Sequence, residues 1–184
     1  LFHSFMSMPN EGYEPRYDDP RVGYFLNYVN DMTETGTTNY RDMINRWRLQ
    51  KKNPDQEISE PVKPITWWIE NSTPMEWRET IREGVLEWNK SFEKAGFKNA
   101  LVVKVQPDDA EWDAGDVRYN VLRWTSSPRP PFGGYGPSMT NPRTGEIIGA
   151  DIMLEFVHFT NRVFYDKLVG DASSNMSLED EEDY

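Results

Sequence analysis

The most regular apolar pattern of the chain lies at residues 73–96. Large apolar side chains recur there at steps of four, four, three, four and three, at Trp77, Ile81, Val85, Trp88, Phe92 and Ala95. That spacing places them on one face of a helix. Thr73 and Glu76 match an N-terminal capping box, and Gly96 suits a left-handed C-terminal cap. The sequence therefore predicts one continuous helix whose tryptophan face lies on a sheet, with Gly84 allowing a close backbone approach.

Runs of β-branched and aromatic residues on both sides of this helix are typical of strands. One run, 64–70, precedes the helix, and another, 101–106, follows it through the short connection of a βαβ unit. Alternating apolar and polar positions predict a third strand at 117–124. An edge segment at 135–146 then leads into a long apolar strand at 147–159, which can pass into a helix. These elements predict an α/β chain.

The residues before the first run have a different character, with prolines, turn residues and short apolar stretches. Residues 22–29 favour a strand, whereas 40–52 have a spacing compatible with a helix or a strand. We favour a strand that pairs with 22–29. The resulting division is an N-terminal arm with a β-hairpin at 1–60, a main body at 61–170 and an acidic tail at 171–184.

Composition narrows the classes of function. The 184 residues fit one domain with an appended arm, and the net charge of −11 argues against a general nucleic-acid or anionic-membrane surface. Without cysteine the chain has no disulfide and no Cys-ligated zinc. No run of about 18 apolar residues predicts a membrane span. The start at Leu1 suggests a segment of a longer protein.

Few residues suggest a catalytic or metal site. The chain has two histidines, His3 and His158, and no H-E-x-x-H motif or phosphate-binding glycine loop. The loop at 108–116 alternates acidic residues like the start of a calcium loop, with ligand candidates Asp109, Glu111 and Asp113. A plain acidic turn is the simpler interpretation. The Trp67–Trp68 pair could stack on a sugar, although core packing is the commoner use of such residues.

The extended segment from Gly133 to Asn141 is a candidate binding element. A strand at a sheet edge can accept a peptide through its main-chain donors and acceptors. The alternative is a loop that covers the edge, and the residues by themselves do not decide between the two. The candidate substrate-binding residues are Tyr135, Gly136, Pro137, Ser138, Met139 and Thr140.

Several phrases together resemble one protein family. They include PVKPITWWIE, the helix phrase W-N-K-x-F-E-K-A-G-F, DVRYNVLRW and N-P-R-T-G-E-I, with FHSFMSMPNEGYEPRYDDPRVGYF near the start. Over residues 2–156 the chain resembles the Met-zincin-like zinc metalloprotease family of the metzincin clan, whose members are secreted or lipid-anchored bacterial proteins. The resemblance implies an extracellular, periplasmic or cell-surface location.

The resemblance also implies a fold. It is the upper subdomain of a metzincin-like catalytic domain: a twisted, mostly parallel sheet, one antiparallel edge strand and a long backing helix. Runs 64–70, 101–106 and 117–124 would be inner strands, with 135–141 the edge strand that binds substrate and 147–156 the next parallel strand. The helix with the zinc-binding H-E-x-x-H motif would follow. No residue here matches the zinc ligands or the general base, and His158 is followed by Phe159 where the motif needs a glutamate.

The expected function is therefore a part of a zinc-dependent metallopeptidase. In the full-length protein, zinc would activate a water molecule for attack on a peptide bond. This segment would supply the scaffold and the edge strand, with a peptide or protein substrate and the remainder of the catalytic domain as partners. By itself it is expected to hold no zinc and to have no catalytic residue. The alternatives are a non-catalytic peptide- or glycan-binding module of a surface assembly and a purely structural subunit.

Overall fold

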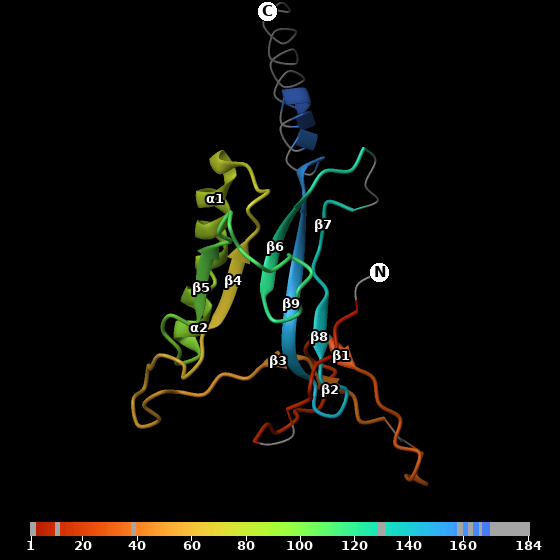
Figure 1. Ribbon diagram of the computed structural model, residues 1–184. Helices are drawn as coiled ribbons and strands as arrows, with labels where there is room; N and C mark the ends of the chain where they lie inside the picture. Colours follow the sequence, from red (N-terminus) through yellow and green to blue (C-terminus); the bar gives the residue numbers. More distant parts are fainter. Residues whose placement is uncertain are drawn as a thin grey trace, which may run out of the picture.

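A computed structural model shows a twisted sheet backed by helices on one face, with the N-terminal arm at one end of the sheet (Figure 1). It describes residues 3–9, 12–37, 40–128, 132–157, 160–161, 164–165 and 167–169. The fold is mixed α/β with a mostly parallel sheet, as the sequence predicts at that level. The predicted acidic tail at 171–184 and His158 lie outside the described residues.

The elements follow one another in a simple order. They are β1 (Leu26–Asn27), β2 (Met43–Ile44), β3 (Arg46–Trp47), β4 (Ile65–Ile69), α1 (Met75–Leu86), α2 (Asn89–Lys94), β5 (Leu101–Val105), β6 (Asn120–Thr125), β7 (Gly134–Tyr135), β8 (Ser138–Thr140) and β9 (Glu146–Glu155). The main sheet has the order β3-β9-β6-β4-β5, and these five strands are parallel to one another. The parallel neighbours β4 and β5, joined through the helices, confirm the predicted βαβ unit.

Strand β9 has neighbours along both of its edges. Ile147 pairs with Trp47 of β3 and with Thr140 of β8. Further along, Met153 pairs with Arg123 of β6 and with Tyr135 of β7. Since two residues separate β7 from β8, both lie on the same edge of β9, and β3 and β6 share the other. β7 and β8, each antiparallel to β9, therefore border a parallel sheet (Figure 1).

The core lies between β4, β5, β6 and the two helices. The alternating burial of β4 points Ile65, Trp67 and Ile69 toward the core, where Ile69 is 1% exposed. Partly buried residues of the helices pack against this cluster, chiefly Ile81, Val85 and Phe92. The arm also contributes, because Trp47 of β3 meets Trp67 edge-on with ring centroids 6.5 Å apart. The apolar alternation of β4 is thus the local reason for this packing.

The prediction of one continuous helix over 73–96 is wrong. The helical stretch consists of α1 and α2, separated by a turn at Glu87–Trp88. Phe92 packs on the core, whereas Trp88, at the N-cap of α2, is 65% exposed. The predicted capping box does not form either. Pro74 is at the N-cap without a side-chain bond, and buried Thr73 instead accepts a bond at its carbonyl from Nε of Arg78, 2.8 Å away.

The two glycines of this region have different surroundings. Gly96 adopts φ +90°, which confirms the predicted left-handed C-terminal cap, and its N–H donates to the carbonyl of Glu93 at 2.9 Å. Nothing lies within 4 Å of a Cβ built on Gly84. The expectation that Gly84 permits a close backbone approach is therefore wrong.

These surroundings predict opposite effects of the same substitution. Gly84→Ala should raise the free energy of unfolding by about 1 kcal/mol, because alanine favours a helix interior and finds open space. Gly96→Ala should lower it by about 1 kcal/mol or more, because of the positive φ and the carbonyl oxygen of Glu57, 3.0 Å from the added Cβ. Urea denaturation of both variants checks this. Equal effects of the two variants would contradict it.

The arm forms the predicted pairing in shortened form. β1 and β2 are antiparallel, with Leu26 opposite Ile44 and Asn27 opposite Met43, so two residues of the expected strand 22–29 are in the strand. The arm also supplies β3 to the main sheet. The predicted strand 117–124 begins three residues late, since residues 117–119 form a turn.

The long strand predicted at 147–159 is confirmed as β9 only as far as Glu155. Phe156 and Val157 have helical backbone instead, and residues 158–159 lie outside the described part of the chain. Among the described residues, no helix has the length and apolar character to cross a membrane.

Candidate functional site

The candidate binding element from the sequence is the edge formed by β7 and β8. Of its predicted residues, Tyr135, Gly136 and Ser138 are exposed, and Pro137, Met139 and Thr140 are partly buried. Both strands pair with β9, so the segment is a strand and not a covering loop. That these residues bind a substrate remains a prediction.

The hydrogen bonds of Pro137 show which backbone groups of the edge face outward. The carbonyl of Pro137 accepts a bond from N–H of Asp151 in β9, at 3.0 Å. No described peptide bond is cis, and in a trans peptide the C=O and the following N–H point in opposite directions. The N–H of Ser138 therefore points away from β9. Alternation along an extended chain gives Gly136 the same outward direction.

Small side chains leave this outward edge accessible. Gly134, Gly136 and Ser138 carry little or no side chain and are all exposed. The neighbouring Tyr135 is 52% exposed and leans on Phe132 with ring centroids 5.7 Å apart. An extended chain laid along this edge would meet backbone donors and acceptors with few intervening side chains.

The far end of β8 is closed by the N-terminal arm. The hydroxyl of Thr140 donates to Oδ1 of Asn27 at 2.9 Å, and Nδ2 of Asn27 donates to the carbonyl of Asn141 at 3.1 Å. Asn141 is 1% exposed, and its own Nδ2 donates to the carbonyl of Pro9 at 3.2 Å. Thr140 is thus bonded within the chain, and the open part of the edge runs from Gly134 to Met139.

Two carboxylates of β9, those of Asp151 and Glu155, bond to β6 and to the residues that follow it. Glu155 is 1% exposed, and it accepts bonds from N–H of Ser127 at 2.6 Å and from the hydroxyl of Thr125 at 2.8 Å. These bonds, chiefly that from the Ser127 backbone, lower the pKa of Glu155. Burial raises the pKa of Asp151, against the bond from Val121 and the charge of Arg123. Glu155 thus fastens the end of β9 to the end of β6.

The lowered pKa of Glu155 makes the stability of the protein depend on pH. Its contribution is present above the ordinary glutamate pKa of 4.5 and is lost as the pH falls through the lower folded-state pKa. Glu155→Gln should therefore lower the free energy of unfolding at neutral pH, with a smaller difference at acid pH. Urea denaturation of both proteins across this range measures the difference. A difference that stays constant with pH would show that the carboxylate charge has no role.

A cleft of about 440 Å³ lies between the first residues of β4 and β9, before β6 begins. β6 begins at Asn120, whose Nδ2 donates to the carbonyl of Thr66 in β4 at 2.8 Å and whose Oδ1 accepts from N–H of Ala150 in β9 at 3.0 Å. This amide joins β4 to β9 where no strand lies between them. The cleft is also lined by Arg48 and Glu146, which form an ion pair at 2.8 Å. It lies on the opposite side of β9 from the edge strands.

The other sequence candidates have structural uses. Asp113 accepts a bond from N–H of Gly115, at 2.8 Å, as in an ordinary acidic turn. Among the described residues, which include the whole loop at 108–116, no three His, Cys, Asp or Glu side chains gather to hold a metal ion. Trp67 is a core residue, whereas Trp68 meets the rings of Trp112 and Tyr119, which stack on each other at 3.9 Å.

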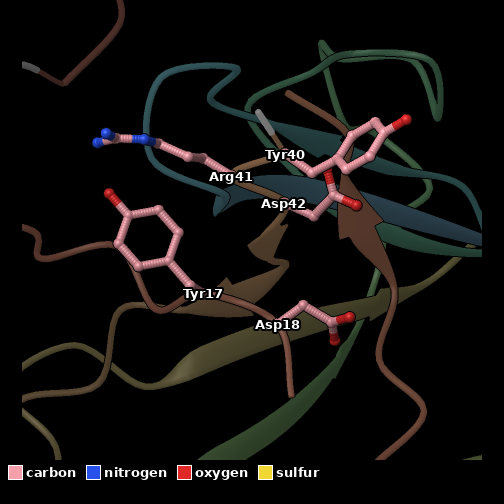
Figure 2. Close-up of a pocket in the computed structure, with 5 residues that line it drawn as sticks. All are labelled: Tyr17, Asp18, Tyr40, Arg41 and Asp42. Atoms are coloured by element: carbon pink, nitrogen blue, oxygen red, sulfur yellow. The ribbon is translucent and has the colours of Figure 1, made fainter. Parts of the chain in front are cut away.

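A second hollow lies in the arm. It has a volume of about 360 Å³ and is lined by Tyr17, Asp18, Tyr40, Arg41 and Asp42 (Figure 2). Figure 2 shows the side chains of Tyr17 and Arg41 on one side and the carboxylate of Asp42 near Tyr40 on the other. The charged groups have partners in the arm: Oδ1 of Asp42 accepts from N–H of Val29, and Arg41 pairs with Asp31 at 3.1 Å. Their charges thus stabilise the hairpin.

Three polar residues that matter here were missed by the sequence reasoning. Asn27 closes the edge, Asn120 joins β4 to β9, and Glu155 holds the end of β9. A signal was available for Glu155, which is a polar residue within an otherwise apolar strand pattern and needs a bonding partner when buried. Asn120 lies at a polar position of an alternating strand, so its sequence context gives no such signal. Nothing near Asn27 in the sequence indicates its role.

The comparisons with known proteins give one match, which is confined to the N-terminal arm. The model of a family described as a domain of unknown function, DUF5117, matches residues 1–52. This range includes β1, β2, β3, the hollow of Figure 2 and Asn27. No curated protein and no solved structure matches the chain.

Proposed function

We propose that this chain is the scaffold and substrate-aligning part of a zinc-dependent metallopeptidase that resembles the Met-zincin-like family. The observation that carries the proposal is the antiparallel edge β7–β8 on an otherwise parallel sheet, with N–H of Ser138 directed outward. An edge of this kind can hold an extended peptide by strand addition. The role of the edge would be to align the peptide, and cleavage would belong to other parts of the full-length protein.

The described residues do not themselves suit a catalytic zinc ion. They include no group of three side chains that could ligate it, so no catalytic step is assigned to this chain. The remainder of the catalytic domain would be its partner. The large exposed side chains Phe164, Tyr165 and Leu168, in the helical residues after β9, offer an apolar surface for such packing. Following the resemblance, we place the protein outside the cytoplasm, in a secreted, periplasmic or surface location.

Backbone pairing by the edge can be tested at Ser138. Ser138→Pro removes the outward N–H, and it spares the bonds to β9 because this N–H does not face that strand. Ser138→Ala keeps the N–H and is the matched control. Affinity for extended peptides should fall about tenfold in Ser138→Pro, the effect of one lost hydrogen bond, and stay nearly unchanged in Ser138→Ala.

Fluorescence anisotropy with labelled peptides measures these affinities, and thermal unfolding shows whether both variants remain folded. Equal affinities of the folded proline and alanine variants would exclude backbone pairing at this edge. In the full-length protein, a zinc chelator should abolish peptide cleavage and Ser138→Pro should lower kcat/KM. Cleavage that persists in the chelator would contradict the metallopeptidase assignment.

The alternative of a non-catalytic peptide-binding module uses the same edge. It predicts the same loss of affinity in Ser138→Pro but no chelator-sensitive cleavage by the full-length protein. The chelator experiment therefore separates the two functions, while the Ser138 variants test the feature that they share.

A further inference from the structure

The N-terminal arm contacts the end of the edge strand through the side chain of Asn27. We infer that Asn27 is a specificity-determining residue that limits the length of the extended peptide accepted along β7–β8. The inference rests on the proposed function of the edge, and it adds a role for the arm.

The side chain of Asn27 lies at the end of β8, where an added strand would continue past Met139. N–H of Asn141 donates to the carbonyl of Glu146 in β9, at 2.8 Å, so the preceding carbonyl, that of Thr140, points to the outer side of the edge. The amide of Asn27 lies at this end of β8, accepting from the Thr140 hydroxyl and donating to the Asn141 carbonyl. A side-chain amide has the same donor and acceptor as a peptide group. A peptide running past Met139 would have to displace it.

The arm holds Asn27 firmly at this position. Its backbone pairs with Met43 of β2, which is 5% exposed. The hairpin packs closely on the turn before β9, since the carbonyl oxygen of Ile44 lies 2.6 Å from the position a Cβ of Gly145 would take. The positive φ of Gly145, +74°, belongs to this turn. The backbone of Asn27 cannot move away from β8 without disturbing the hairpin or its contact with the turn.

The open edge has a defined length. It runs from Gly134 to Met139, which at roughly 3.4 Å per residue is about 20 Å. A peptide of about six residues spans this distance. Longer peptides should gain little further affinity in the wild type, because their additional residues meet the arm rather than free backbone groups.

A nested series of extended peptides, about four to ten residues long, tests this limit. Acetylated and amidated ends keep terminal charges from varying along the series. Wild-type affinity should rise up to about six residues and then level off. Asn27→Ala should continue to gain, by roughly tenfold over the next residues, because the end of β8 with the outward carbonyl of Thr140 is then no longer covered by the Asn27 side chain.

Asn30→Ala is the matched control, since Asn30 is exposed and lies in the same arm, where its backbone bridges to Tyr40. It should keep the wild-type length limit. Thermal unfolding identifies any variant that has lost the fold. An unchanged limit in folded Asn27→Ala overturns the inference, as does a loss of affinity by the same factor at every length, which a merely structural role would cause. Absence of binding to the wild type at any length overturns the proposed function and the inference together.

Discussion

The pairing of β9 along both of its edges is the interaction on which the rest of the structure depends. One edge of this ten-residue strand carries β3 and β6, and the other carries β7 and β8. Through β6 the strand is connected to β4, β5 and the helix-covered core. Through β3 and β8 it also holds the N-terminal arm. A change in the register of β9 would alter the parallel sheet, the edge and the arm together, since a shift by one residue turns every side chain to the other face.

Buried polar groups secure that register. Glu146 at the start of β9 is 7% exposed and pairs with Arg48 of the arm, and Glu155 at its end is bonded by Thr125 and Ser127. Between them, N–H of Ala150 bonds to Asn120. Each group would be costly to bury without its partner. Because these partners come from separate segments, they favour one alignment of the strands over its neighbours, which apolar packing specifies less sharply.

The same arrangement explains why the edge is open in one part and closed in another. Where β7 meets β8, small residues and a proline leave outward backbone groups unobstructed. Where β8 ends, the arm supplies Asn27, and the edge has a bonding partner from the chain itself. An uncovered edge is a hazard for aggregation, and a short edge with a covered end reduces it. The proposed alignment of a peptide uses the part that remains free.

The βαβ unit could be predicted because its signals are local. The alternation in β4, the apolar stripe of α1 and the β-branched run of β5 each lie within a few consecutive residues. The edge character of 135–140 was also readable, from its small residues and Pro137. The break between α1 and α2 could not be predicted, because Trp88 fits the apolar stripe although it is 65% exposed in the turn before α2.

By itself, the sequence determined the main strands and the helical region, and hence a mixed α/β chain with a candidate edge. Only the tertiary structure decided that β9 is central, that Asn120 joins two strands and that the arm ends the open edge. The physical reason is distance along the chain: Thr140 and Asn27 are 113 positions apart, and Asn120 and Thr66 are 54 apart. The spacing of apolar residues indicates on which face of its helix or strand a residue lies. The partner that this residue meets depends on how the elements pack.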